Sequence, residues 1–470
     1  MSLKTLLSSI AVSTLFAGLA LGETSQNPLM SEEFFTDKTT VAAVQAALDA
    51  GARLDVRGPY GENPLHIAIE GHAPLDVIKL LIAKGAEVNQ PAGKKGNVVA
   101  LYAAYAGNLE LMKVLKDAGA DFKAVDDLKE TALHWLTYSD KYDPAVLAFL
   151  LAEGLDPNAQ SQNGDTPARS VAWHQSADAG KMLEDFVAAG SDPSGINADG
   201  QDAFMMSISY AGGLSGMLDR FYDMSEDPKA VDNNGLSGIL LASQWGVDKP
   251  RMEFLQSKGF DLNAETPKGE NAIILNATYG DGASMKLLTD AGLDINSQDN
   301  KGNSPLLVAM VENEPANIRA IIEAGADVAH SNDKGETALL RALARKIDDP
   351  ASNAGKELIA LIDLLIENGG DLKATDAAGA TALIYAVKSD QPLARIDQII
   401  AAGVDVNATD AEGTTALMHA ALSGKNPGVI KALVAAGADT SVKDVFEDTA
   451  AVMAADNAAL AGNDVLTLLQ

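Results

Sequence analysis

A short loop signature recurs along almost the whole chain and constrains the fold more than any other feature. It reads Gly-Ala-Asp or a close variant, often followed two residues later by Asn, as in Gly85-Ala86-Glu87-Val88-Asn89 and Gly403-Val404-Asp405-Val406-Asn407. Successive copies are separated by roughly 33 to 36 residues, with a degenerate copy at Ser225, where the glycine is lost, and one longer step between Gly325 and Gly369. A constant period of this size is typical of solenoids, in which small units stack on their neighbours.

A second signature follows each glycine by about ten to twelve residues. It consists of Thr, Ser or Asn, then Pro or a small residue, then Leu, and its clearest copies are Asn63-Pro64-Leu65-His66, Thr131-Ala132-Leu133-His134, Thr337-Ala338-Leu339 and Thr415-Ala416-Leu417. Thr, Ser and Asn cap helix N-termini, and Pro is tolerated in a first helical turn. Glycine supplies the left-handed residue that ends a helix. Each period therefore predicts two helices and a loop.

The two signatures in phase resemble the ankyrin repeat. The resemblance implies an all-α fold, an ankyrin-repeat solenoid of about twelve helix-turn-helix repeats with β-hairpin-like loops. It also implies reversible protein binding through the concave groove and the hairpin tips. The pattern is poorest between about Asp202 and Met252, where it rests on spacing more than on residues. The copies begin near Asn63, Val99, Thr131, Thr166, Asp202, Ser237, Asn271, Ser304, Thr337, Thr381, Thr415 and Thr449.

The N-terminus has the features of a secretory signal peptide over residues 1–22. Lys4 precedes an apolar run from about Leu6 to Leu21, and small residues stand just before Glu23. A membrane anchor is the alternative, but the run is short and is interrupted by Ser and Thr. We therefore expect an exported bacterial protein without a stable membrane anchor, located in the periplasm or, alternatively, outside the cell.

The rest of the chain reads as one repeat array. Residues 23–30 form a linker and residues 31–470 the solenoid, in which 31–60 is an N-terminal cap half-repeat, 61–448 the repeats and 449–470 a C-terminal cap. The longer step contains an insertion near residues 346–353, which predicts a protruding loop.

Composition and motifs exclude several classes of function. The formal net charge of −30 disfavours nucleic acid, because phosphates would be repelled. The same charge favours a basic protein partner by electrostatic steering, although acidic loops also belong to the repeat pattern. The chain has no cysteine, and no phosphate-binding or hydrolase motif. His66 and His134 occupy the structural histidine position of the repeat, so we expect no metal, no cofactor and no enzyme activity.

One feature of the sequence, a recurring aromatic residue, is not part of the ankyrin-repeat pattern. An aromatic residue stands near the end of the first helix in each of six successive repeats, and two interpretations remain open. The rings could pack between helices, or they could form a recognition stripe in the groove, since Tyr and Trp dominate interface hot spots. A protein is the first ligand class, and a carbohydrate or cell-wall polymer stacking on the rings is the alternative. The six residues are Tyr105, Tyr138, Trp173, Tyr210, Trp245 and Tyr279.

Overall fold

The computed structural model describes residues 27–93, 96–173, 178–209, 217–312, 315–347, 349–455 and 457–470. The predicted signal peptide, residues 23–26 of the predicted linker and Tyr210 lie outside the described residues. The chain divides into two compact units. Unit 1 comprises Met1–Ser207 and Gly212–Pro228, and unit 2 comprises Ile208–Ala211 and Lys229–Gln470.

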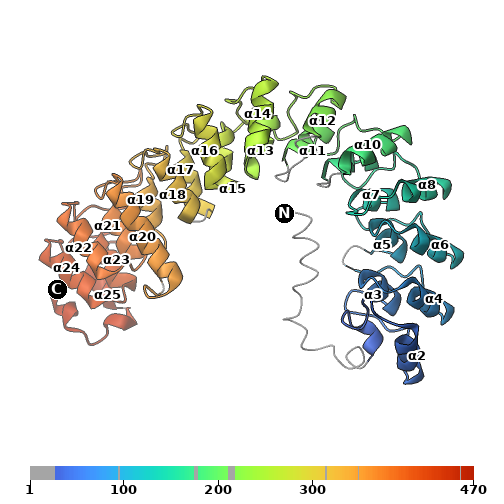
Figure 1. Ribbon diagram of the computed structural model, residues 1–470. Coiled ribbons are helices and arrows are strands. Elements are labelled where there is room, and N and C mark those ends of the chain that lie inside the picture. The colour runs from blue at the N-terminus through green and yellow to red at the C-terminus, as the bar shows by residue number, and fades with distance from the viewer. Residues whose placement is uncertain are drawn as a thin grey trace. The chain divides into compact units, whose positions relative to one another are not determined.

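Unit 1 is built from short helices joined in pairs by tight turns, and the first helices of neighbouring pairs pack side by side (Figure 1). Leu29, within the predicted linker, is fully buried. The helices are η2 (Pro28–Met30), α2 (Val41–Asp49), α3 (Pro64–Glu70), α4 (Leu75–Ala83), α5 (Val99–Tyr105), α6 (Leu109–Asp117), α7 (Ala132–Thr137), α8 (Pro144–Ala152), α9 (Pro167–Ser170), η3 (Val171–Trp173), α10 (Ala179–Ala188), α11 (Ala203–Ser209, whose last two residues fall in unit 2) and α12 (Leu218–Met224).

Unit 2 repeats the same arrangement. Its helices are α13 (Gly238–Gln244), α14 (Lys249–Ser257), α15 (Ala272–Tyr279), α16 (Gly282–Asp290), α17 (Pro305–Glu312), α18 (Pro315–Glu323), α19 (Ala338–Leu343), α20 (Asn353–Glu367), α21 (Ala382–Lys388), α22 (Leu393–Ala401), α23 (Ala416–Ser423), α24 (Pro427–Ala435), α25 (Ala450–Ala455), η4 (Ala458–Leu460) and η5 (Asp464–Leu468). The loops of the described residues hold isolated antiparallel bridges, such as Thr409 with Thr415. The predicted all-α repeat solenoid with hairpin-like loops is confirmed.

The second signature starts the first helix of each repeat. Thr337 is the N-cap of α19, and its hydroxyl accepts a hydrogen bond of 3.2 Å from the backbone N–H of Leu340. Thr415 caps α23 in the same way through Met418. The leucine two residues after each cap, Leu339 or Leu417, is fully buried. The signature therefore fixes both the helix start and one core residue.

The Gly-Ala-Asp signature ends the second helix and joins neighbouring repeats. Gly85 follows α4 with φ +95°, a left-handed conformation that favours glycine. The side chain of Asn89 then donates to the carbonyl of Gly119 at 2.9 Å and accepts from the N–H of Asp121 at 2.8 Å. The same pair of bonds joins Asn158 to Gly190 and Asp192, and Asn407 to Gly437 and Asp439.

The buried histidines tie loops together. Nδ1 of His134 lies 3.1 Å from the backbone N–H of Thr131 and accepts its hydrogen bond, while Nε2 donates to the carbonyl of Asp165 at 2.9 Å. Burial lowers the pKa of His134, so the ring is neutral at pH 7. In the next repeat Arg169 occupies the equivalent place, is almost fully buried, and donates to the carbonyl of Gly164.

The insertion is divided between a loop and a longer helix. α20 has 15 residues, whereas α18 and α22 have nine each. Its apolar residues continue one buried stripe at helical spacing, which includes Leu358, Leu361 and Leu365. Residues 344–347 and 349–352 lie in a loop, and Ile347 within it is buried.

Candidate partner-binding surface

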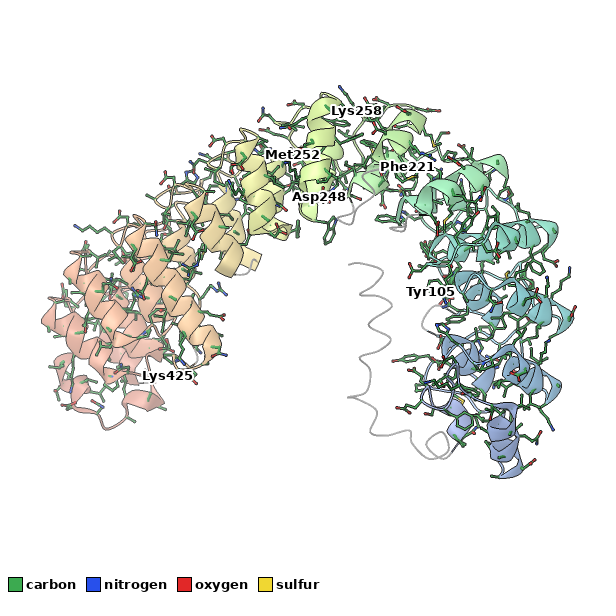
Figure 2. All side chains as sticks on the ribbon, in the orientation of Figure 1. Tyr105, Phe221, Asp248, Met252, Lys258 and Lys425 are labelled. Atoms are coloured by element: carbon green, nitrogen blue, oxygen red, sulfur yellow. The ribbon has the colours of Figure 1, made fainter. Side chains whose placement is uncertain are left out.

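In unit 1 the first predicted stripe residue is half-buried. Tyr105 ends α5 (Figure 2), and its ring centre lies 6.4 Å from that of Trp135 in an edge-on arrangement. It lines a hollow of about 270 Å³ together with His72, Asp140 and Lys141. Burial and the nearby Asp140 carboxylate raise the pKa of the Tyr105 phenol. This residue is partly packed and partly available to a ligand.

The contacts of Tyr138 and the partial burial of Trp173 favour the packing interpretation. Tyr138 follows α7, and its hydroxyl donates a hydrogen bond of 2.8 Å to Glu130, in the loop before that helix. Burial and the Glu130 carboxylate raise the pKa of Tyr138 well above its usual value. Trp173 ends η3 and is half-buried. Tyr138 therefore connects its helix to its own loop.

Unit 2 presents the exposed members of the stripe. Trp245 follows α13, Tyr279 ends α15, and each side chain is 56% exposed. Their ring centres lie 6.4 Å apart and the ring planes are inclined by 32°. Val311 lies near the end of α17, one residue before the position that corresponds to Tyr279, and is 65% exposed. We call Trp245, Tyr279 and Val311 the apolar row.

The loop tips of unit 2 are joined by backbone hydrogen bonds between neighbouring repeats. The carbonyl of Lys268 accepts from the N–H of Asn300 at 2.9 Å, and that of Lys301 from Asp333 at 3.1 Å. The carbonyl of Lys334 accepts from Ala377 at 2.8 Å. These bonds place Lys268, Lys301 and Lys334 in register, one per repeat. We call these three residues the lysine row.

A further set of ring side chains was missed by the sequence reasoning. The carboxylate that organises the turn before the first helix accepts a hydrogen bond from a ring nine residues later. Asp126 accepts from the indole N–H of Trp135 at 3.3 Å and Asp376 from the phenol of Tyr385 at 2.8 Å. Asp410 lies 2.8 Å from Nε2 of His419. An aspartate followed by Trp, Tyr or His at this spacing is the signal that could have revealed them.

The same aspartates also hold the loop backbone. Oδ1 of Asp410 accepts from the N–H groups of Glu412 and Thr414, at 3.2 and 3.0 Å. Burial raises the pKa of the Asp410 carboxyl, but the hydrogen bonds from His419 and Thr414 outweigh it, so the pKa is lowered. Burial lowers the pKa of His419, which therefore donates as a neutral ring at pH 7. These contacts shape the loop, and the tip residues Ala411 and Glu412 remain exposed.

Within the part of the chain that the structure describes, no three His, Cys, Asp or Glu residues gather closely enough to hold a metal ion. Among the described helices, none has the length and apolarity needed to cross a membrane. The described surface presents exposed apolar side chains, such as those of Trp245 and Tyr279, and exposed lysines at the loop tips.

Comparison with known proteins identifies the repeat in both units. Residues 60–92 match the ankyrin repeat profile, and residues 350–444 match a profile of three ankyrin repeats. The chain therefore contains ankyrin repeats.

The chain spans only a small part of the curated relatives that it matches. The chain is 30% identical over 125 residues to the human neurogenic locus notch homolog protein 1, which is 27% of this chain and 5% of that protein. It is 32% identical over 172 residues to the Drosophila melanogaster neurogenic locus Notch protein, which is 33% of this chain and 6% of that protein. Among solved structures, the ankyrin repeat domain of Bcl-3 is 24% identical with a TM-score of 0.34, over 46% of this chain and 88% of that chain.

Proposed function

We propose that this protein is a non-enzymatic scaffold of the bacterial periplasm that binds a protein partner. Ankyrin repeats generally mediate contacts between proteins, and both units contain them. The observation that carries the proposal is the apolar row of unit 2, because large apolar side chains are seldom left exposed side by side without a binding role. A basic partner agrees with the net charge of −30, which would steer it toward the surface.

A carbohydrate or cell-wall polymer is the second candidate. Trp245 and Tyr279 form two neighbouring exposed rings inclined by 32°, and such rings can stack against sugar faces. We rank it second because the described face of unit 2 adds aliphatic Val311 rather than a third ring to the apolar row.

The test compares two variants of the tagged mature protein in capture from periplasmic extract. Trp245→Ser with Tyr279→Ser removes the rings, and Val187→Ser with Leu468→Ser removes exposed apolar side chains elsewhere. We expect one polypeptide to be retained by the wild type and the control but lost by the ring variant. Retention of the wild type and the control on insoluble peptidoglycan, with loss only for the ring variant, would instead support the second candidate. Equal capture by every variant would overturn the role of the rings.

The proposed export to the periplasm can be tested separately. Cleavage after residue 22 would leave Glu23 at the N-terminus. Mass spectrometry of protein from periplasmic extract should find that terminus, whereas a cytosolic protein that retains Met1 would refute the periplasmic proposal.

A further inference from the structure

We propose that the loop tip at residues 444–448 and the helix that follows it bind an extended segment of a partner protein, in which apolar residues alternate with Lys or Arg. The exposed side chains of Val445, Phe446 and Val452 form the surface, which we call the end patch. This inference rests on the proposed scaffold function and specifies where a basic partner attaches. The backbone hydrogen bonds of the tips, the exposure of the patch and its local charge each contribute to it.

The loop tips of unit 2 are joined by a series of backbone hydrogen bonds that reaches this tip. The N–H of Val445 donates to the carbonyl of Glu412, in the preceding tip, at 3.0 Å. Phe446 holds the place of Glu412 in its own tip. Each of the two precedes a left-handed residue, Glu447 at φ +66° or Gly413 at φ +74°. The Phe446 carbonyl is therefore turned toward the next position of the series, where no described residue donates a hydrogen bond to it, so it can accept one from another chain.

The side chains at this tip are more apolar than those of the preceding tips. Phe446 is 76% exposed and Val445 is 63% exposed. A large aromatic side chain that a tight turn holds in solvent is typical of a contact with another molecule. The two corresponding places hold Asp333 and Lys334 in one tip, Ala377 and Ala378 in the next, and Ala411 and Glu412 in the tip before this one.

Val452 extends the apolar surface onto α25. This helix packs beside α23, and its Ala450 and Ala454 are buried. Val452 lies between them in the chain and is 53% exposed, whereas Met418 at the corresponding place of α23 is 1% exposed. Both residues stand three positions after the threonine that precedes their helix. The repeat array therefore buries this position in α23 and leaves it open in α25.

The charge around the end patch is negative when every charged residue of the two neighbouring tips is counted. Lys443 pairs with Glu447 at 3.0 Å, and Lys388 approaches Asp410 at 3.9 Å. Five carboxylates against these two lysines leave a net local charge of −3, which attracts a cationic segment. The five carboxylates belong to Asp410, Glu412, Asp444, Glu447 and Asp448.

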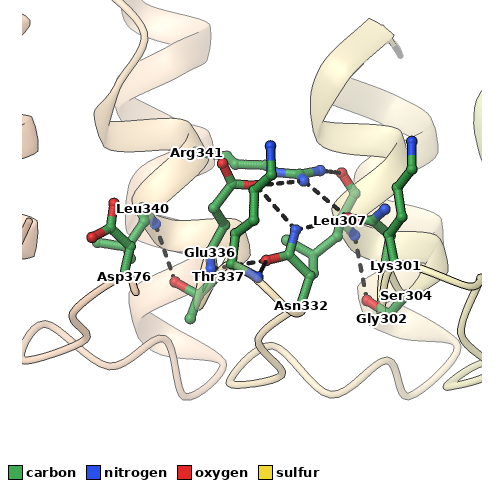
Figure 3. Close-up of polar contacts among 12 residues, drawn as sticks. Lys301, Gly302, Ser304, Leu307, Asn332, Glu336, Thr337, Leu340, Arg341 and Asp376 are labelled. Carbon is green, nitrogen blue, oxygen red and sulfur yellow. Dashed lines mark hydrogen bonds and ion pairs between the residues drawn. The ribbon is translucent and has the colours of Figure 1, made fainter. Parts of the chain in front are cut away.

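The interior tip before α19 neutralises its own carboxylate, and the tip of the end patch does not. Arg341 on α19 pairs with Glu336 at 2.7 Å and donates to the side chain of Asn303, in the preceding repeat (Figure 3). Asp448 holds the place of Glu336, directly before the threonine, but Met453 stands where the arginine would be. Within the described parts of the chain, no cationic side chain pairs with Asp448. Its carboxylate is therefore available to a Lys or Arg of the partner.

A second copy of this chain cannot continue the hydrogen-bond series with its own first tip. Gly58 closes that tip by donating to the carbonyl of Glu62 at 2.8 Å, in the way that Asp444 closes the tip of the end patch. Pro59 therefore holds the place of Val445, and proline has no backbone N–H. Head-to-tail growth of the series is blocked, which favours a different polypeptide as the occupant.

An extended segment can use the acceptor, the apolar surface and the charge at once. Successive side chains of an extended chain point to opposite sides, so apolar residues that alternate with basic ones share one side. A backbone N–H of the segment reaches the Phe446 carbonyl, and its apolar side covers Phe446 and Val452. The basic side chains between them are long enough to reach the surrounding carboxylates, such as that of Asp448. Nucleic acid does not fit, because its phosphates are repelled by the same charge.

The experiment measures the fluorescence anisotropy of labelled peptides with the full mature chain. The probe is Lys-Val-Lys-Phe-Lys-Val-Lys. One comparison peptide carries Glu in place of Lys, and a second carries Ser in place of Val and Phe. A third has methyl groups on all backbone nitrogens, which removes the N–H donors. We expect the wild type to bind the probe more tightly than any of these.

The first variant removes the apolar tip through Val445→Ser with Phe446→Ser. Its control removes exposed apolar side chains from two other loops through Ile196→Ser with Val231→Ser. We expect the tip variant to weaken binding of the probe about tenfold, because an aromatic hot spot dominates a small interface. The control should change the affinity by less than about twofold. Equal loss in the two proteins would overturn the inference.

The second variant removes two charges at the patch through Glu412→Gln with Asp448→Asn. Its control removes two charges at other exposed positions of unit 2 through Glu265→Gln with Asp333→Asn. We expect the patch charges to matter about threefold and the control charges less than about twofold, because exposed pairs contribute modestly and over short distances. An equal effect of both changes would show that only the overall charge attracts the probe, and would reject local recognition.

Three further outcomes decide between occupants and between proposals. Tighter binding of the Glu peptide or the methylated peptide would overturn the inference, as would a dimer in sedimentation that the tip variant converts to a monomer. Failure of every peptide while the ring variant still loses its captured polypeptide would reject this inference and leave the scaffold function standing. Unchanged capture by the ring variant, with loss of probe binding in the tip variant, would keep this inference and reject the role of the rings.

Discussion

The rings of Trp245 and Tyr279 lie 6.4 Å apart, centre to centre, although one repeat separates the two residues in the chain. Each side chain is still 56% exposed, so the contact does not bury either ring. In unit 1 Tyr138, which stands seven residues after its N-cap where Trp245 and Tyr279 stand eight after theirs, uses its hydroxyl to bind Glu130. An aromatic residue near the end of the first helix therefore serves packing in one repeat and an exposed surface in another.

The first prediction concerns the stability of the ring variant. Trp245→Ser with Tyr279→Ser should lower the unfolding free energy by less than about 1 kcal/mol in total, because exposed substitutions rarely change it by more than about 0.5 kcal/mol each. Chemical denaturation measures this. Tryptophan emission should shift to shorter wavelength, because the two remaining indoles, Trp135 and Trp173, are buried and half-buried. A loss of several kcal/mol would show that the rings support the fold.

Tyr138 should behave in the opposite way. Tyr138→Phe removes the hydrogen bond from the phenol to Glu130, and we expect a loss of about 1–2 kcal/mol in unfolding free energy. Tyr279→Phe is the matched control, since its side chain is exposed and its hydroxyl has no protein partner among the described residues. Equal stabilities for the two variants in urea denaturation would contradict the packing role of Tyr138.

The repeat length, the helix starts and the helix ends could be predicted because each depends on local chemistry. Thr337 and Thr415 cap helices through their own hydroxyls, and Gly85 has the left-handed backbone that its place after a helix requires. The insertion was predicted only in part. A loop was expected near residues 346–353, yet α20 begins at Asn353 because its apolar spacing continues further than the family pattern.

The candidate surface was less predictable from the sequence, because the exposure of a side chain depends on the residues that the fold places beside it. The sequence placed Tyr138 and Tyr279 in one class, and only the position of Glu130 separates them. The lysine row was missed because its residues are ordinary tip lysines when each repeat is read alone. Their alignment follows from backbone bonds between repeats, such as that from Asp333 to the Lys301 carbonyl.

Acid should destabilise unit 1 through His66. This ring is fully buried, and burial lowers its pKa to about 4 from an unfolded value near 6.5. Between these values the unfolded chain binds a proton that the folded chain excludes, so the unfolding free energy falls as the pH drops from about 6.5 to about 4. The loss at pH 4 would be roughly 3 kcal/mol. Denaturation of wild type and His66→Gln across this range checks it, and the variant should show the shallower pH dependence.

Asn407 should contribute to the coupling of the last repeats. Its side chain donates to the Gly437 carbonyl at 3.2 Å and accepts from the Asp439 N–H at 2.7 Å. Asn407→Ala removes both bonds, and we expect a loss of about 1–3 kcal/mol. Asn368→Ala is the control, because its side chain bonds only within its own helix end, to the Leu364 carbonyl. Hydrogen exchange of residues 416–455 should accelerate in Asn407→Ala and not in the control.

The last prediction concerns residues 457–470 and asks whether they cover the apolar side chains at the end of the repeat array. Leu460 is 1% exposed and Val465 is fully buried, whereas Leu468 in the same segment is 41% exposed. The side chain of Asn457 also holds the segment by donating to the carbonyls of Ala421 and Gly424. Each repeat of a solenoid is stabilised by its neighbours, so the segment should protect the apolar side of α23 and α24.

Leu460→Ala should therefore cost about 2–5 kcal/mol locally, because it leaves a cavity where a buried leucine packed. Leu468→Ala should cost less than about 0.5 kcal/mol, although both changes remove the same atoms. Hydrogen exchange with mass spectrometry can follow the terminal repeat separately from the rest. Faster exchange of residues 427–470 in Leu460→Ala alone would support a closing role for the segment. Equal exchange in both variants would show that the repeats before it are stable without its packing.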